Sequence, residues 1–216
     1  MHVRFQNMRQ KNHTGGAGFW YNQPQPAELP GLKGIRTEMA RKVVIGVTGS
    51  IAAYKACELV RLFVKAGWDV QVAMTEHARE FVTPLTFRTL SRNPVQCDMF
   101  EDPLTWKPEH ISLADAADVL VIAPATANVI AKMAHGIADD LLTSVALATK
   151  APIWVAPAMN AGMWENPVTQ ENIDALKSRG VAFVHPGEGE LACGTSGPGR
   201  MAEPEEIFRA VSGSMV

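Results

Sequence analysis

The chain has 216 residues, of which 47% are hydrophobic and 19% are charged, so it is long enough to bury one globular core. A formal net charge of −2 excludes a strongly basic surface, and we expect neither a nucleic-acid nor a membrane partner. The three cysteines include no CxxC pair and HExxH is absent, so we expect no disulfide framework, no metal site and a reducing, cytoplasmic location.

Residues 1–41 differ from the rest of the chain. They contain Gly15-Gly16 and three prolines, and they show no helical or strand periodicity. The segment is poor in acidic residues, as transit peptides are, but it lacks their amphipathic Arg/Ser pattern. We expect a flexible N-terminal arm or extension, followed by one folded domain over residues 42–212.

The first regular unit begins at Lys42. A β-branched run over 42–47 is typical of a buried parallel strand, and Ile51–Ala66 has one apolar helical face, with a second strand at 68–74. The intervening Thr48-Gly49-Ser50 offers backbone N–H groups and a hydroxyl to a phosphate at the helix start, although a simple tight turn would use the same glycine. GxGxxG and the P-loop motif are absent, which disfavours NAD and FAD and leaves a mononucleotide phosphate.

The remaining elements alternate between helices and strands. In chain order we expect a short helix over 76–82, a helix from 83 to 90, a strand over 95–100, a loop over 102–109, a strand over 118–123, helices over 129–135 and 141–149, a strand over 151–156, a helix over 172–179, a strand over 181–184, a Gly-rich polar loop over 187–200 and a closing helix over 204–211. This alternation predicts an α/β fold with a Rossmann-like (flavodoxin-type) doubly wound parallel sheet in a single domain.

Four strand ends are expected to converge at one edge of that sheet: Thr48-Gly49-Ser50, Thr75, Pro124–Asn128 and Pro157–Trp164. They supply hydroxyls, amides and backbone donors with few charges, which suits an aromatic cofactor with a phosphate better than a metal. The last segment holds an amide, two thioethers and an indole. From composition alone it either covers the core or clamps a ligand through Asn160.

Two side chains are candidates for proton transfer. His110 carries an imidazole, which takes or gives a proton near neutral pH, but a lone histidine also occurs on surfaces and in cores. Cys193 lies in the Gly-rich loop, where a thiol can act as an acid, as a nucleophile or have no role. Cys57 falls on the apolar face of a helix and is interpreted as core.

Several short motifs occur together in a fixed order: GSIAAYK at Gly49–Lys55, His110-Ile111, Pro124–Asn128, Gly136–Asp139, Pro157–Trp164, Ala192–Gly194 and Gly199–Glu203. With these motifs, the chain from Lys42 to about Ile207 resembles the homo-oligomeric flavin-containing cysteine decarboxylases. Thr126 stands where the family often has Ser or Asp, which keeps a polar group.

The resemblance implies FMN as the cofactor and a homotrimer or dodecamer with the flavin near a subunit interface. His110 would be the active-site base and Cys193 the final proton donor, while Asn160 would bind the substrate and Met163 would close the clamp. The cofactor would be bound by Gly49, Ser50, Ile51, Thr75, Phe81, Ala125, Thr126, Ala127, Asn128 and Met159.

The implied activity is decarboxylation of 4′-phosphopantothenoylcysteine, a small phosphorylated cysteine conjugate, to 4′-phosphopantetheine in coenzyme A biosynthesis. A flavin provides the electron sink that a cysteine carboxylate lacks. The alternatives are a peptidyl-cysteine decarboxylase, which would release an enethiol and need no Cys193 acid, and a non-catalytic flavin-binding regulatory subunit. No ligase half follows Glu206, so we expect a monofunctional decarboxylase or an excised half.

Overall fold

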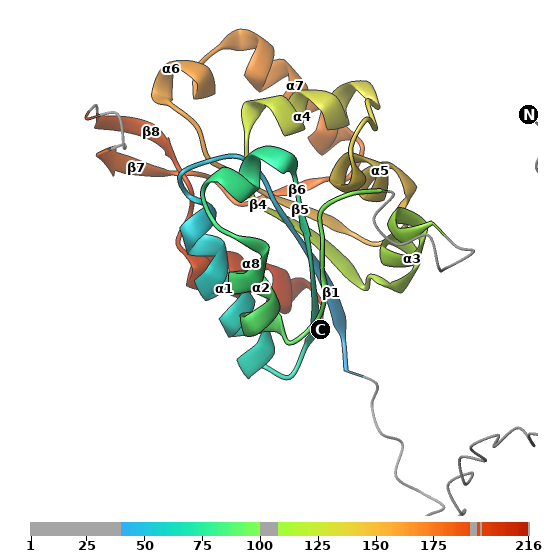
Figure 1. Cartoon of the computed structure of the whole chain (residues 1–216). Helices are drawn as coiled ribbons and strands as arrows, with labels where there is room; N and C mark the ends of the chain where they lie inside the picture. The colour runs from blue at the N-terminus through green and yellow to red at the C-terminus, as the bar shows by residue number, and fades with distance from the viewer. Residues whose placement is uncertain (1–39, 100–107, 191–193, 195, 216) are drawn as a thin grey trace, which may run out of the picture. The chain divides into compact units, whose positions relative to one another are not determined.

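Six parallel strands form the central sheet of the part of the chain that the structure describes (Figure 1). This computed structural model describes residues 40–99, 108–190, 194 and 196–215. The strand order β3-β2-β1-β4-β5-β6 is the Rossmann order, so the predicted doubly wound α/β sheet is confirmed. The strands are β1 (Lys42–Val47), β2 (Asp69–Met74), β3 (Val95–Gln96), β4 (Val119–Ala125), β5 (Ile153–Pro157) and β6 (Ala182–Phe183).

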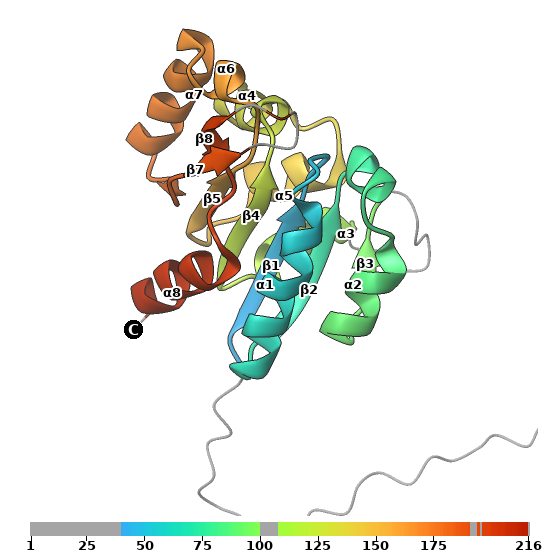
Figure 2. The same ribbon diagram turned by 90° about the vertical axis from the view of Figure 1, so that its left-hand side faces the viewer.

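Helices cover both faces of this sheet (Figure 2). One face carries α1 (Ala53–Lys65), α2 (Pro84–Ser91) and α8 (Pro204–Ser214). The other carries α3 (Glu109–Ala116), α4 (Ala127–His135), α5 (Leu141–Ala148) and α7 (Pro167–Ser178). Among the residues that the structure describes, no helix is long and apolar enough to cross a membrane.

Alternate residues of the central strands supply two separate cores. Val43 and Ile45 of β1 pack under α1, whereas Val44 between them packs under the helices of the opposite face. Leu120 and Val121 of β4 divide in the same way. Because successive strand side chains point to opposite faces, a continuous apolar run is what a strand covered on both sides requires.

Five element predictions are corrected by the structure. The predicted loop over 187–200 contains an antiparallel hairpin of β7 (Gly187–Glu190) and β8 (Ser196–Arg200). Its glycines and Pro198 lack the β-branched signal of a strand. The post-β5 segment includes a short helix, α6 (Ala161–Trp164), and α7 begins at Pro167 because Asn166 caps it. β3 has two residues instead of six, and α3 was not predicted as a helix. A short 3-10 helix, η1, covers Glu76–Glu80.

Candidate functional site

The four predicted strand ends meet at the carboxyl edge of the sheet, as expected. β2, β1, β4 and β5 are neighbours in that order and run parallel. The amide of Thr75 donates to the Val47 carbonyl at 3.0 Å, and the amide of Ala158 donates to the Ala125 carbonyl at 2.9 Å. The loops that follow these strands therefore start from a fixed common edge.

Thr48 joins the two central strand ends where the strand order reverses. Its side chain is completely buried. Its Oγ1 donates to the Pro124 carbonyl at 2.7 Å and accepts from the Thr126 amide at 3.0 Å. Thr126 in turn caps α4, since its side-chain oxygen accepts from the Val129 amide. A single hydroxyl thus sets the spacing between the loops after β1 and β4.

We expect Thr48→Val to lower the free energy of unfolding by about 1–3 kcal/mol, because it leaves a buried carbonyl and a partly buried amide without their partner. Valine keeps the side-chain volume, so the loss isolates the hydroxyl. Thr48→Ser retains both hydrogen bonds and is the matched control. Equilibrium urea unfolding measures the difference, and a valine variant as stable as the serine variant would refute the link.

A cavity of about 680 Å³ lies beside these strand ends, within the size range of small-molecule sites. The start of α1, the segment after β5 and the β7–β8 hairpin enclose it. Its described lining residues are Ser50, Ile51, Ala52, Tyr54, Lys55, Ala158, Met159, Asn160, Glu190, Gly194, Gly199, Arg200 and Met201. It therefore brings together four residues predicted for the site, from two motifs about a hundred positions apart.

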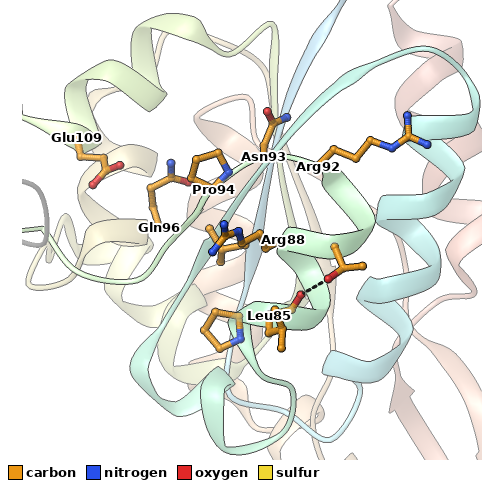
Figure 3. A pocket seen from close by; sticks show the side chains of 10 residues that line it. Leu85, Arg88, Arg92, Asn93, Pro94, Gln96 and Glu109 are labelled. Atoms are coloured by element: carbon orange, nitrogen blue, oxygen red, sulfur yellow. Dashed lines mark hydrogen bonds between the residues drawn. The ribbon is translucent and has the colours of Figure 1, made fainter.

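A larger cavity, of about 1020 Å³, lies between α2, β3 and the start of α3 (Figure 3). Figure 3 shows Gln96 and Glu109 on one side of it and Leu85 and Arg88 on the other. It contains none of the predicted site residues and lies at the edge strand of the sheet. Ligands of doubly wound sheets bind near the reversal of strand order, so we place the candidate site in the smaller cavity.

Strand β8 forms one wall of the candidate site by direct backbone contact. The Met159 amide donates to the Gly199 carbonyl at 3.0 Å. Gly199 has a φ of 120°, and a Cβ at this position would overlap the Met159 carbonyl oxygen. Only glycine permits both this backbone conformation and this close approach. The hairpin is consequently fixed against the segment that carries Met159 and Asn160.

Asn160 has a second, structural task. Its Oδ1 accepts from the Gly162 amide at 2.8 Å, which caps α6. This hydrogen bond fixes the rotation of the side-chain amide beside the cavity. Met163, on α6, is 49% exposed and does not line the cavity. Trp164 is half-buried and packs against the core under α4 and α7.

His110 lies in the first turn of α3 and does not line the candidate cavity. Its ring is half-buried, and Nδ1 has no hydrogen-bond partner in the part of the chain that the structure describes. A buried ring nitrogen without a partner is uncommon in a structural histidine. The structure therefore does not bring His110 to Asn160 within one chain.

The other predicted residues fall into two groups. Gly49, Thr75, Ala125 and the following residues to Asn128 lie at or just after the strand ends, and Phe81 follows η1 with 47% of its surface exposed, but none of them lines the cavity. Cys193 lies outside the described residues, although its neighbour Gly194 lines the cavity. Cys57 is half-buried on α1, and burial raises the pKa of its thiol.

Sequence reasoning missed the charged part of the cavity wall. Lys55 is 8% exposed, and its Nζ donates to the Glu203 carboxylate at 2.9 Å and to the Met201 carbonyl at 3.3 Å. Arg200 also donates to Glu203, at 2.9 Å. One signal in the sequence could have indicated this wall. Lys55 stands four positions before Leu59, so it lies on the buried apolar stripe of α1. Lysine is rare at buried positions unless its charge is paired.

The Glu203 carboxylate gives the site a specific pH response. Its hydrogen bond from Lys55, with a smaller contribution from Arg200, lowers its pKa below the ordinary value of 4.5. Because the pKa of Glu203 is lower in the folded state than in the unfolded state, its carboxylate stabilises the fold when the pH is above the ordinary pKa. This stabilisation is lost as the pH falls through the folded-state pKa. The side chain is 49% exposed, so we expect less than about 1 kcal/mol.

We therefore predict that the stability difference between wild type and Glu203→Gln shrinks as the pH is lowered from about 6 to about 3. Chemical denaturation at several pH values measures this difference. Added salt should reduce it at pH 6, because half-exposed ion pairs are screened. A difference that is independent of pH would show that Glu203 contributes no charge interaction to the fold.

The cavity fits a flavin mononucleotide by its donor set. The positive end of the α1 dipole, with Ser50 and Lys55 beside it, suits an anionic phosphate. Ile51, Tyr54 and Met159 offer apolar and polarisable surface for an aromatic ring. Within the described residues no group of three His, Cys, Asp or Glu side chains is placed to hold a metal ion.

A doubly wound parallel sheet with such a cavity at its carboxyl edge defines an α/β protein of the nucleotide-cofactor-binding class. The comparison with known families is more specific. The chain belongs to the Flavoprotein family, whose profile matches residues 35–216.

Individual relatives agree with this assignment. The chain is 51% identical over 169 residues to the coenzyme A biosynthesis bifunctional protein CoaBC of Bacillus subtilis, covering 78% of this chain and 42% of that protein. It is 44% identical to a probable phosphopantothenoylcysteine decarboxylase of Streptococcus mutans, covering 80% of this chain and 98% of that protein. The chain thus spans less than half the length of the bifunctional relatives it matches.

A solved structure shares the fold at a TM-score of 0.74 and 33% identity, covering 82% of this chain and 98% of the other. It is a PPC decarboxylase mutant, with a cysteine replaced by serine, complexed with pantothenoylaminoethenethiol.

Proposed function

We propose that the chain is an FMN-dependent decarboxylase of 4′-phosphopantothenoylcysteine and yields 4′-phosphopantetheine for coenzyme A biosynthesis. One observation carries the proposal: a single cavity joins Ser50 and Ile51 of the first loop to Met159 and Asn160 of the last. The relative at 44% identity is named a probable phosphopantothenoylcysteine decarboxylase, and the relative at 51% identity is named a coenzyme A biosynthesis protein. The cytoplasm, where coenzyme A precursors would be available, is the proposed location.

The proposed cofactor contacts follow the geometry of the strand ends. Ser50 and Ile51, at the start of α1, hold the phosphate, and Met159 lies against the ring. Gly49, Thr75, Phe81 and the turn from Ala125 to Asn128 complete the binding region. FMN is preferred over FAD because the GxGxxG fingerprint for a dinucleotide is absent from the first loop. When bound, FMN would supply reversible two-electron chemistry at the substrate cysteine, which a carboxylate without an electron sink requires for the loss of CO₂.

Four side chains divide the remaining work in this proposal. The His110 imidazole accepts the proton released when the substrate cysteine is oxidised. The Asn160 amide donates to the substrate carboxylate from a rotation that Gly162 fixes, and Met163 closes over the bound substrate. The Cys193 thiol protonates carbon in the final step, after CO₂ has left.

The proposed site needs more than one chain. His110 does not line the cavity that holds Asn160, so we propose that it reaches the substrate of a neighbouring copy. This supports a homo-oligomer, which we propose to be a trimer or a dodecamer. Sedimentation velocity of the flavin-loaded protein tests the assembly, and a monomer with full activity would refute it.

The function is tested by loading the purified protein with FMN and measuring CO₂ release from two substrates. We expect release from 4′-phosphopantothenoylcysteine and little from a peptide with a carboxyl-terminal cysteine. The reverse preference would identify a peptidyl-cysteine decarboxylase. A protein that binds FMN but releases CO₂ from neither substrate would be a flavin-binding regulatory subunit, and a protein that binds no FMN would refute all three.

A further inference from the structure

The ion pair between Lys55 and Glu203 is unusual because its lysine is buried. Removing a lysine from water is costly, and such a residue is retained only when its charge and N–H groups are partnered. Lys55 is 8% exposed and has two partners, both on the segment that follows β8: the Met201 carbonyl and the Glu203 carboxylate. These contacts span almost 150 positions of sequence, so they tie α1 to the end of the hairpin.

Glu203 also contacts Arg200 of β8 and caps helix α8. The same Oε1 atom accepts from Lys55 and from Arg200, each at 2.9 Å. Glu203 is also the N-cap residue of α8, where it forms a capping box with Glu206. The end of β8 is therefore held between α1 and α8 by one carboxylate.

The same stretch of chain fixes the substrate side of the cavity. Two residues before Met201, the Gly199 carbonyl accepts from the Met159 amide, and the backbones touch without an intervening side chain. Met159 directly precedes Asn160. A continuous series of contacts thus runs from Lys55 through Met201 and Gly199 to Met159 and its neighbour Asn160.

We propose that Lys55 is a positioning residue: through Met201 and Glu203 it holds β8 in the register that fixes Met159 and Asn160 at the cavity wall. For catalysis this inference rests on the proposed function, but the positioning itself concerns only the fold. Lys55 exchanges no proton in this role. Methionine at position 55 would keep most of the side-chain volume but could form neither the hydrogen bond to Met201 nor the ion pair with Glu203.

Hydrogen–deuterium exchange of the full-length, FMN-supplemented protein tests the positioning without any substrate. The Lys55→Met variant loses a charge-assisted hydrogen bond. In this variant the Met159 amide should therefore exchange at least about tenfold faster than in wild type. The exchange of α7 should be unchanged. Lys65→Met, on the exposed last turn of the same helix, is the matched control and should resemble wild type.

Two further variants keep the test decisive. Lys55→Arg retains the charge and should restore most of the protection of Met159. If Lys55→Met does not fold, Glu203→Gln, at a half-exposed position, should produce a smaller local increase in exchange at the same amide. Unchanged protection of Met159 in the folded Lys55→Met or Glu203→Gln variant would overturn the proposal.

The catalytic consequence is measured by a double-mutant cycle. If Lys55 acts through Asn160, Lys55→Met should lower kcat/KM by about tenfold in wild type and have little effect in an Asn160→Ala background with residual activity. Equal effects in both backgrounds would indicate a merely structural role and contradict the proposal. A wild-type protein that releases no CO₂ would refute the proposed function alone, because the exchange experiment still decides the positioning.

Discussion

Replacing His110 by asparagine is expected to lower kcat for CO₂ release by about a hundred- to ten-thousand-fold, the range typical of a lost general base. Asparagine approximates the size and polarity of the ring but cannot accept the proton. Because His110 does not line the cavity, FMN binding and the melting temperature should stay close to those of wild type. Steady-state kinetics of the flavin-loaded variant measure the effect, and a variant with full activity would refute the role of His110.

A mixed oligomer separates the roles of neighbouring chains. His110→Asn and Asn160→Asp chains are each expected to be nearly inactive alone. If His110 of one chain serves the cavity of another, co-expressed chains should form some sites with both native residues and recover activity. No recovery in a verified mixed oligomer would show that each site uses residues of a single chain.

The second large effect is a change of product. Cys193→Ser is expected to release CO₂ but to accumulate the unsaturated enethiol instead of 4′-phosphopantetheine, because a hydroxyl is a much weaker acid than a thiol. Mass spectrometry of the products distinguishes the two compounds.

Cys57→Ser is the matched control for that experiment. Cys57 is half-buried on α1, where burial raises the pKa of the thiol and disfavours the thiolate. Its serine variant should form the same saturated product as wild type. Saturated product from Cys193→Ser as well would mean that another group protonates the carbon.

The fold was predictable where the sequence has strong periodicity. Strands β1 and β4 are continuous apolar runs because both faces are covered, and α1 has one apolar stripe, so the doubly wound sheet follows from local pattern. The hairpin was missed because its glycines serve backbone approach, not strand propensity. Gly199 is needed for contact with Met159, a partner that is distant in sequence.

The candidate site was predictable in outline for a related reason. Parallel strands place their carboxyl ends together, which brought the loops at Ser50 and Asn160 to one cavity. The position of Lys55 on the buried stripe of α1 indicates a paired lysine, but its partners depend on tertiary contacts that no local pattern encodes. Lys55 finds its partners after β8, almost 150 positions away in sequence, whereas the cap that orients Asn160 is a local contact with the amide two residues later.

The most direct test of the proposed reaction is a product analysis from anaerobic single turnover of the FMN-loaded wild-type chain. Stoichiometric enzyme and 4′-phosphopantothenoylcysteine are mixed, quenched and examined by mass spectrometry, while flavin absorbance is followed. The proposal predicts a product that has lost CO₂ alone, with the flavin oxidised at the end. A product that has lost CO₂ and two hydrogens, with the flavin left reduced, would contradict it.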